Sequence, residues 1–216
     1  MNPALVFDMD GVLVDVGESY RETIQQTVAH FTGRRVSREE IQQWKNRGGW
    51  NDDWKLSTAM IRAAGAAVEY DEVVDRFQKL FHGNGTDGLM LRERWIAREG
   101  LLERLAGRFR LCVFTGRLRW EAELTLRRFG AEPLFDRIVG AGEVERHKPA
   151  PDGLLLIDGA VWYVGDTVDD ARSARAAGVA FIGIAPPSSE TAALLAADGA
   201  VAVLPDINRL EEAVGA

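Results

Sequence analysis

The chain has 216 residues, of which 46% are hydrophobic and 27% are charged, and its formal net charge is −7. This composition is typical of a soluble globular protein, and the acidic balance disfavours a nucleic-acid partner, because that binding depends on Lys and Arg neutralising phosphates. No apolar segment reaches the ~18 residues that span a membrane, so we predict a cytoplasmic protein with no membrane partner. The single cysteine, Cys112, lies in an apolar run and indicates a buried structural thiol.

Strand-like and helix-like runs follow one another along the chain. It opens with a β-rich run at 4–7, which two aspartates and a glycine follow directly. The next interval is helical, with helices expected at 18–31, 38–45, 53–64 and 71–81. Four further β-rich runs lie at 110–114, 137–141, 161–165 and 179–184, with helical patterns between most of them. This alternation predicts an α/β fold with a parallel sheet wound with helices.

The helical interval predicts a separate insertion after the first strand. Its connections are 14–17 and the glycine-rich 83–88, the second of which can serve as a hinge. We therefore expect a core of residues 1–15 and 88–216, and an all-helical domain of residues 16–87. The linker GNGTDG also fits the nucleotide-binding pattern GxGxxG, but it follows a helical run and so lacks the strand-to-helix turn that the pattern needs.

Acidic side chains follow two of the predicted strands. Asp8 and Asp10 share one side of the chain, because side chains alternate along a strand, and they lie where open α/β sheets bind ligands. Two carboxylates this close require a shared proton or a bound cation. Asp166, Asp169 and Asp170 follow the strand at 161–165, and hard oxygen ligands of this kind suit Mg²⁺, although alone they also fit an acidic helix N-terminus.

Two other predicted strand ends carry polar groups. Thr115 and Gly116 end the run at 110–114, where a hydroxyl and backbone N–H groups could bind the oxygens of an anion. Lys148 lies in HKPAP, a loop that its prolines stiffen. Each feature alone is common, but the parallel sheet brings four such strand ends to one edge.

In chain order, FDMDGV, VFTG, the lysine of HKPAP and VGDTVDD resemble the four motifs of the haloacid dehalogenase (HAD) superfamily. The resemblance covers the whole core and implies a Rossmann-like parallel sheet with helices on both faces. The helical insertion just after the first motif resembles the C1 cap of subfamily I, which includes phosphoglycolate phosphatases, β-phosphoglucomutase and 2-haloacid dehalogenases.

The resemblance implies a phosphatase that hydrolyses a small phosphorylated metabolite through an aspartyl-phosphate on Asp8. Asp10 would act first as general acid and then as general base, and Thr115, Gly116 and Lys148 would bind the phosphoryl group. The implied Mg²⁺ ligands are Asp8, Asp10 through its backbone carbonyl, Asp166 and Asp170, with Asp169 as the alternative to Asp170.

Other functions remain open at this point. A phosphomutase of the same fold would return the phosphoryl group to its substrate. A 2-haloacid dehalogenase is disfavoured, because those enzymes need neither Mg²⁺ nor an acid at the position of Asp10. A phospho-receiver module shares the acidic pocket but is much shorter and has no insertion. Phosphoglycolate, a sugar phosphate and histidinol phosphate all fit as substrates, and the sequence favours no oligomeric state.

The insertion is where capped members of this family contact the substrate beyond its phosphate. The segment 44–54 holds three tryptophans around a double glycine, and it predicts either a packed helix corner or a specificity loop with Arg47. Arg21 is a second candidate, and either arginine could bind an anionic or hydroxylated leaving group. Arg117 could contact substrate or begin the next helix, and we leave it outside the catalytic set.

Overall fold

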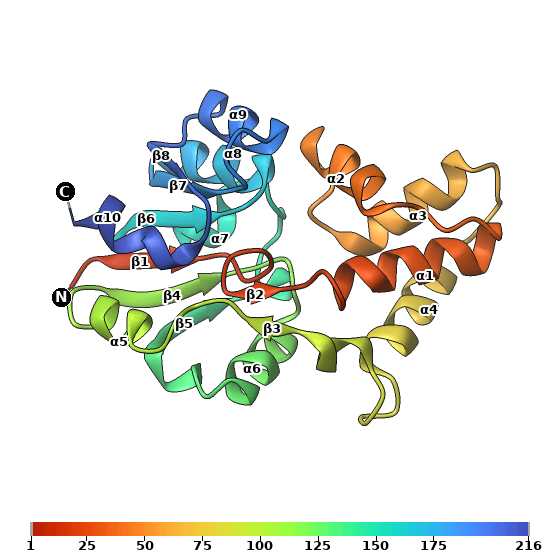
Figure 1. Cartoon of the computed structure of the whole chain (residues 1–216), viewed down its shortest axis with the longest axis horizontal. Helices are drawn as coiled ribbons and strands as arrows, with labels where there is room; N and C mark the ends of the chain where they lie inside the picture. Colours follow the sequence, from red (N-terminus) through yellow and green to blue (C-terminus); the bar gives the residue numbers. More distant parts are fainter. Residues whose placement is uncertain (1, 216) are drawn as a thin grey trace. The chain divides into compact units, whose positions relative to one another are not determined.

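The computed structural model describes residues 2–215, which form two compact units (Figure 1). The first unit comprises the chain up to Val14 and from Trp95 onward, and the second comprises Asp15–Arg94. The chain passes between them through β2 (Val14–Asp15) and β3 (Arg94–Trp95), which pair as a two-stranded ribbon. The predicted division into domains at residues 15 and 88 stays a prediction.

The first unit is built on a six-stranded sheet in the order β5-β4-β1-β6-β7-β8, and every pair of neighbours is parallel. Its strands are β1 (Ala4–Phe7), β4 (Arg110–Phe114), β5 (Phe135–Val139), β6 (Ala160–Gly165), β7 (Ala180–Ile184) and β8 (Ala202–Leu204). All four residues of β1 are buried, as expected for a central strand covered on both faces. Burial also raises the pKa of the Cys112 thiol on β4 to about 11, which agrees with a structural role.

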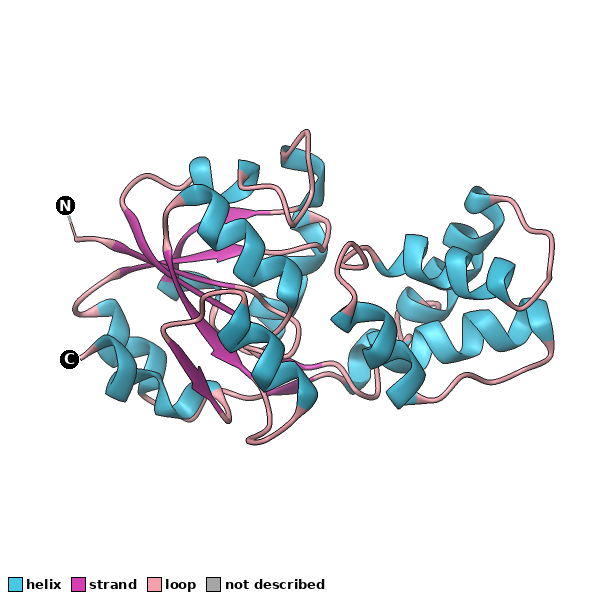
Figure 2. Ribbon diagram, turned by 90° about the horizontal axis from the view of Figure 1, so that it is seen from above, coloured by secondary structure: helices cyan, strands magenta, loops and turns pink. Residues whose placement is uncertain are grey.

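Helices cover both faces of this sheet (Figure 2), which confirms the predicted α/β class. They are α5 (Leu101–Ala106), α6 (Arg119–Arg128), α7 (Asp152–Leu155), α8 (Val168–Ala177), α9 (Glu190–Ala197) and α10 (Leu210–Val214). Short 3₁₀ turns occur in this unit at Glu132–Leu134, Ala141–Glu143 and Ile207–Arg209, and another lies in the second unit at Leu89–Arg92. Ala171 and Ala174 of α8 pack in the same core cluster as Tyr163 of β6 and Phe181 of β7.

The strand register sets the position of the polar strand ends. Phe7 of β1 is level with Val113 of β4 and with Val164 of β6. The residues that follow these three strands therefore emerge at one edge of the sheet, where parallel α/β sheets bind their ligands.

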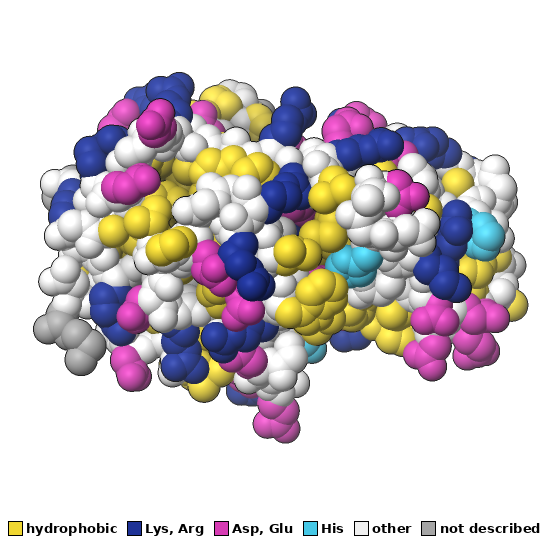
Figure 3. Space-filling view, turned by 90° about the horizontal axis from the view of Figure 1, so that it is seen from below, with side chains coloured by type: hydrophobic (Ala, Val, Ile, Leu, Met, Phe, Trp, Pro, Cys, Tyr) yellow, Lys and Arg dark blue, Asp and Glu magenta, His cyan; other side chains and the backbone are white. Residues whose placement is uncertain are grey.

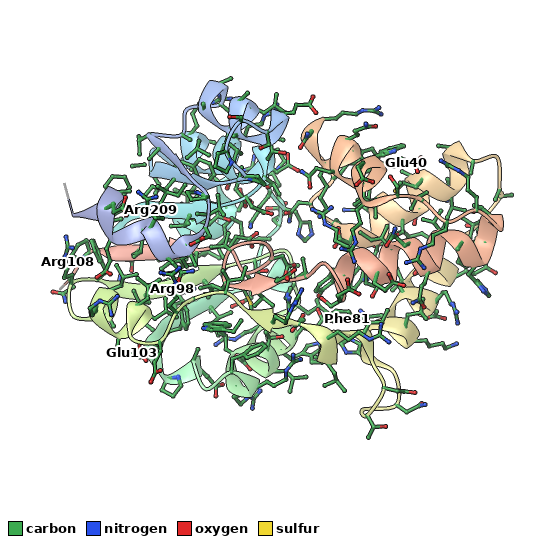
Figure 4. All side chains as sticks on the ribbon, in the orientation of Figure 1. Glu40, Phe81, Arg98, Glu103, Arg108 and Arg209 are labelled. Atoms are coloured by element: carbon green, nitrogen blue, oxygen red, sulfur yellow. The ribbon has the colours of Figure 1, made fainter. Side chains whose placement is uncertain are left out.

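The second unit contains four α-helices among the described residues: α1 (Tyr20–Thr32), α2 (Arg38–Asn46), α3 (Asp53–Ala63) and α4 (Tyr70–His82). The predicted insertion of helices is thereby confirmed. A capping box between Ser37 and Glu40 begins α2. Aromatic rings pack in the core of this unit, where the centroids of Tyr20 and Phe81 are 4.1 Å apart (Figure 4 labels Glu40 and Phe81).

The visible surface in Figure 3 carries acidic and basic side chains that are interspersed with apolar ones. Within residues 2–215, none of the helices has both the length and the apolar character that crossing a bilayer requires.

Candidate active site

Asp8 follows β1 and is almost completely buried, with 4% of its surface exposed. Its backbone N–H donates to the carbonyl of Val164 at 2.8 Å, which ties the turn to β6. Gly11 in this turn has a φ of +76°, and a Cβ there would lie 2.1 Å from Oδ2 of Asp166. Glycine is therefore required both by the backbone conformation and by the close approach of Asp166.

Lys148 lies between two buried carboxylates. Its Nζ is 3.0 Å from Oδ1 of Asp8 and 2.7 Å from Oδ1 of Asp170, and all three side chains are at most 5% exposed. The ammonium also lies 4.8 Å from the Phe114 ring centroid and 5.3 Å from that of Tyr163. The ammonium carries three N–H donors and has two carboxylate oxygens at hydrogen-bond distance, so one donor is left for a further anion.

Asp170 is fixed by neutral donors as well as by Lys148. The Tyr163 hydroxyl donates to its Oδ1 at 2.7 Å, and the backbone N–H and hydroxyl of Thr167 donate to its Oδ2 at 3.1 and 2.6 Å. Burial alone would raise the pKa of Asp170, but Lys148 and these donors lower the pKa below its usual value. Lys148 and these donors therefore stabilise the ionised form of Asp170.

Asp8 and Lys148 have shifted pKa values for opposite reasons. Burial raises the pKa of Asp8 well above its usual value, against the attraction of Lys148, and the neighbouring carboxylates raise it further. Burial would lower the pKa of Lys148, but Asp170 and Asp8 raise it above its usual value. The site therefore contains a permanent cation beside a carboxylate that is costly to ionise without further positive charge.

Asp8, Asp166 and Asp170 each offer a carboxylate oxygen, and these oxygens lie within 4.8 Å of one another. Three hard oxygen donors at this separation fit a magnesium ion, which binds few protein carboxylates and keeps several waters. Asp170 belongs to this cluster, whereas Asp169 and the side chain of Asp10 do not.

Thr115 is buried beyond the end of β4, and its backbone N–H donates to the carbonyl of Val139 at 3.0 Å. Its hydroxyl oxygen accepts a hydrogen bond from the backbone N–H of Arg117 at 3.2 Å. The hydroxyl proton takes no part in this bond. Gly116, between the two, is exposed.

Asp10 has a partner that sequence reasoning missed. The Nε of Arg117 donates to Oδ1 of Asp10 at 2.9 Å, and its Nη2 donates to the same oxygen. The Arg117 side chain is 1% exposed, so it neither caps a helix in solvent nor forms a surface charge. The position of Arg117 in the sequence was the signal that could have predicted this contact. An arginine two residues after Thr115 lies at the edge of the sheet where the carboxylates meet.

The two arginines predicted to contact the substrate lie in the second unit. Arg21 on α1 donates from Nη2 to Oε1 of Gln42 at 3.0 Å. Arg47 directly follows α2 as its C-cap, with its guanidinium 5.4 Å from the ring centroid of Trp44. The rings of Trp44 and Trp50 meet edge to face at 4.9 Å and are half-buried, so this corner packs partly against itself. The contact of either arginine with substrate stays a prediction.

Comparisons with known proteins agree with this site. The family model of haloacid dehalogenase-like hydrolases matches residues 5–184. A phosphoglycolate phosphatase of Cereibacter sphaeroides is 29% identical over 188 residues, which cover 83% of each chain. The phosphatase Tt82 from Thermococcus thioreducens has a solved structure with a TM-score of 0.62 and 28% identity, and the match covers 80% of this chain and 86% of that one.

A third relative is named imidazoleglycerol-phosphate dehydratase, from Phytophthora nicotianae. It is 34% identical over 206 residues, which cover 89% of this chain but 45% of that protein. This chain therefore spans less than half of that relative's length. The predicted resemblance and the predicted class of enzyme are confirmed, because the matched family model covers all four motifs and the helical insertion: the chain belongs to the haloacid dehalogenase-like hydrolase family.

Proposed function

We propose that this protein is a Mg²⁺-dependent phosphatase that hydrolyses a small phosphorylated metabolite through an aspartyl-phosphate on Asp8. The observation that carries the proposal is the placement of Lys148 against a buried Asp8, with two further carboxylates in the same cluster. The names of the phosphoglycolate phosphatase and of phosphatase Tt82 support the same chemistry.

Asp8 would attack the phosphorus atom, so that a bond forms from its carboxylate oxygen as the bond to the leaving oxygen breaks. The remaining N–H of Lys148 and the hydroxyl of Thr115 would bind the phosphoryl oxygens, with the backbone N–H of Gly116 beside them. Lys148 already neutralises part of the charge on Asp8, which lowers the repulsion between a carboxylate and a phosphate dianion.

Asp10 would donate a proton to the leaving alkoxide and later take one from the attacking water. Its side chain is 30% exposed, whereas that of Asp8 is 5% exposed, so water reaches the second carboxylate more easily than the first. This difference in exposure fits the division of roles between them.

Asp8, Asp166 and Asp170 would hold Mg²⁺, together with the backbone carbonyl of Asp10. When bound, the ion supplies positive charge between the nucleophile and the phosphate and so reduces their repulsion. The raised pKa of buried Asp8 is consistent with this need for additional positive charge.

The second unit would supply specificity, with residues 16–87 acting as a cap domain. Nη1 of Arg21 is buried and has no hydrogen-bond partner in the described part of the chain, and the side chain of Arg47 is exposed. Either donor could bind a carboxylate, hydroxyl or ring nitrogen of the leaving group. Phosphoglycolate, a sugar phosphate and histidinol phosphate are the candidate substrates, and the Phytophthora relative's name favours a phosphate that carries an imidazole.

The first test is hydrolysis of p-nitrophenyl phosphate by the wild type and by Asp8→Asn, each in Mg²⁺ and in EDTA. We expect turnover that requires both Asp8 and the metal, and equal activity with and without metal would contradict the proposal. A panel of metabolite phosphates then ranks substrates by kcat/KM. A phosphomutase would give an isomer of a sugar phosphate in place of released phosphate.

The specificity proposal is tested by Arg21→Ala and Arg47→Ala. We expect a change in the ranking of the panel with little change for p-nitrophenyl phosphate. Arg34→Ala is the matched control, because Arg34 is 59% exposed and pairs with Glu40 in the same unit. An unchanged ranking in both variants would reject this role for the two arginines.

A further inference from the structure

We propose that Arg117 is a positioning residue, which fixes the carboxylate of Asp10 for proton transfer to the leaving group. The inference rests on the proposed role of Asp10 and adds to it a residue outside the four motifs. The contact between the two side chains is direct, since Nε and Nη2 of Arg117 both donate to Oδ1 of Asp10.

The two donors converge on one carboxylate oxygen. Oδ1 of Asp10 receives both N–H groups, and Oδ2 receives neither of them. A carboxylate held through one oxygen keeps its orientation while the other oxygen carries the proton. Oδ2 is therefore the oxygen that gives its proton to the leaving alkoxide as the phosphorus–oxygen bond breaks, and that takes a proton from water in the return step.

Arg117 itself cannot move easily. Its Nη1 donates to the hydroxyl of Thr125 at 2.8 Å, and Thr125 is fully buried on α6. Its backbone N–H donates to the Thr115 hydroxyl, and its carbonyl accepts from the N–H of Ala141 at 2.9 Å. The chain also packs closely here, because a Cβ on Gly140 would lie 2.9 Å from the Arg117 carbonyl oxygen.

This fixation matters because general acid catalysis depends on geometry. Asp10 follows the buried Met9 but has a side chain that is 30% exposed, so its own surroundings restrict it less than they restrict Asp8. A rigid guanidinium, which binds through more than one N–H, orients a carboxylate better than a lysine does. The arginine thus compensates for the exposure of Asp10.

The test measures kcat/KM for p-nitrophenyl phosphate, phenyl phosphate and glycerol phosphate in the wild type and in Arg117→Met. This parameter reports the step in which the leaving group departs, and it excludes the later hydrolysis of the aspartyl-phosphate. We expect a loss of about 30–100-fold with glycerol phosphate, whose alkoxide needs a proton, and of about 3-fold or less with p-nitrophenyl phosphate, which does not.

Arg117→Lys and Thr125→Val provide the same test if Arg117→Met fails to fold. The first keeps the charge with one donor group, and the second removes only the support at Nη1, so both should show the same dependence on the leaving group with smaller losses. Arg119→Met is the matched control, because Arg119 is 53% exposed and pairs with Glu123 and Glu143, not with Asp10. It should leave all three substrates unchanged.

A double variant tests whether Arg117 acts through Asp10. If Arg117 acts through Asp10, Asp10→Asn with Arg117→Met should be no slower than Asp10→Asn alone. An equal loss for all three substrates, or multiplied losses in the double variant, would overturn the inference and indicate that Arg117 binds the phosphoryl group directly. Retained Asp8-dependent hydrolysis of p-nitrophenyl phosphate would leave the proposed phosphatase function intact in either case.

Discussion

Replacement of Lys148 by methionine tests the electrostatic basis of the site. The ammonium lies 3.0 Å from Asp8 and 2.7 Å from Asp170, and none of the three side chains is more than 5% exposed. Methionine keeps most of the side-chain volume and its contact with the Phe114 and Tyr163 rings, but it leaves two buried carboxylates without their cation.

Removal of one partner from a buried ion pair destabilises a protein by about 3–5 kcal/mol, and we expect a loss of that size for Lys148→Met at neutral pH without metal. The pH dependence of this loss of stability follows from the pKa shifts of Asp170 and Lys148. Asp170 has a lowered pKa, so the stability it contributes is present above the unfolded value of 3.8 and is lost as pH falls. Lys148 has a raised pKa, so its contribution is constant below the unfolded value of 10.5. The difference between variant and wild type should therefore shrink as the pH falls toward the range in which Asp8 and Asp170 bind protons.

Urea denaturation at several pH values, in EDTA and in Mg²⁺, measures this effect. Mg²⁺ should recover part of the lost free energy of unfolding, because the ion supplies positive charge to the same two carboxylates. Arg209→Met is a suitable control, since Arg209 and Glu212 form an exposed pair and the change should have no measurable effect. A variant as stable as the wild type at neutral pH in EDTA would refute the reasoning.

Three further predictions follow from the same geometry. Asp8→Asn should raise the midpoint of thermal unfolding in EDTA at pH 7.5, because burial disfavours the charged form of Asp8. The same variant should lose most of the stabilisation by Mg²⁺, because it lacks one of the proposed ligands. A midpoint below that of the wild type in EDTA would contradict this prediction. For the wild type, the raised pKa of Asp8 means that stability in EDTA falls as pH rises through that pKa, and the thermal shift on adding Mg²⁺ should be larger at pH 7.5 than at pH 5. Gly11→Ala should displace Asp166 and so weaken the apparent Mg²⁺ affinity by about 10–100-fold. Gly130→Ala is the control, because Gly130 also has a positive φ but lies in open space, and its affinity should not change. Equal affinities of the two variants in a Mg²⁺ titration would reject this explanation.

The parallel core could be predicted because its strands are short apolar runs with clear polar ends. β4 was predicted at its observed limits, since Arg110–Phe114 is apolar after its first residue and is followed by Thr115 and a glycine. β8 was missed because its three residues are only partly buried, so no apolar run distinguishes Ala202–Leu204 from a loop. α5 was missed for a related reason, since its six residues are too few to show a helical period.

The candidate site was predictable as far as it depends on strand ends. Asp8 and Asp166 follow buried strands, so a parallel sheet brings them together whatever the details of packing. The network behind them was not predictable, because it depends on side chains that cross the sheet. Tyr163 reads as an ordinary strand residue, yet its hydroxyl fixes Asp170, and Arg117 reads as a helix-start cation, yet it is buried against Asp10.

The charges of the site residues would connect Mg²⁺ binding with the stability of the fold. Asp8, Asp10, Asp166 and Asp170 carry four negative charges when all are ionised, and the two buried cations are Lys148 and Arg117. The remaining formal charge of this set is −2, which one divalent cation offsets. Because burial and the neighbouring carboxylates raise the pKa of Asp8, proton binding and the proposed metal binding would compete for the same carboxylate. The pH dependence of stability and the affinity for Mg²⁺ should therefore change together in every variant that alters this charge, and both should stay at their wild-type values in variants such as Arg119→Met that do not.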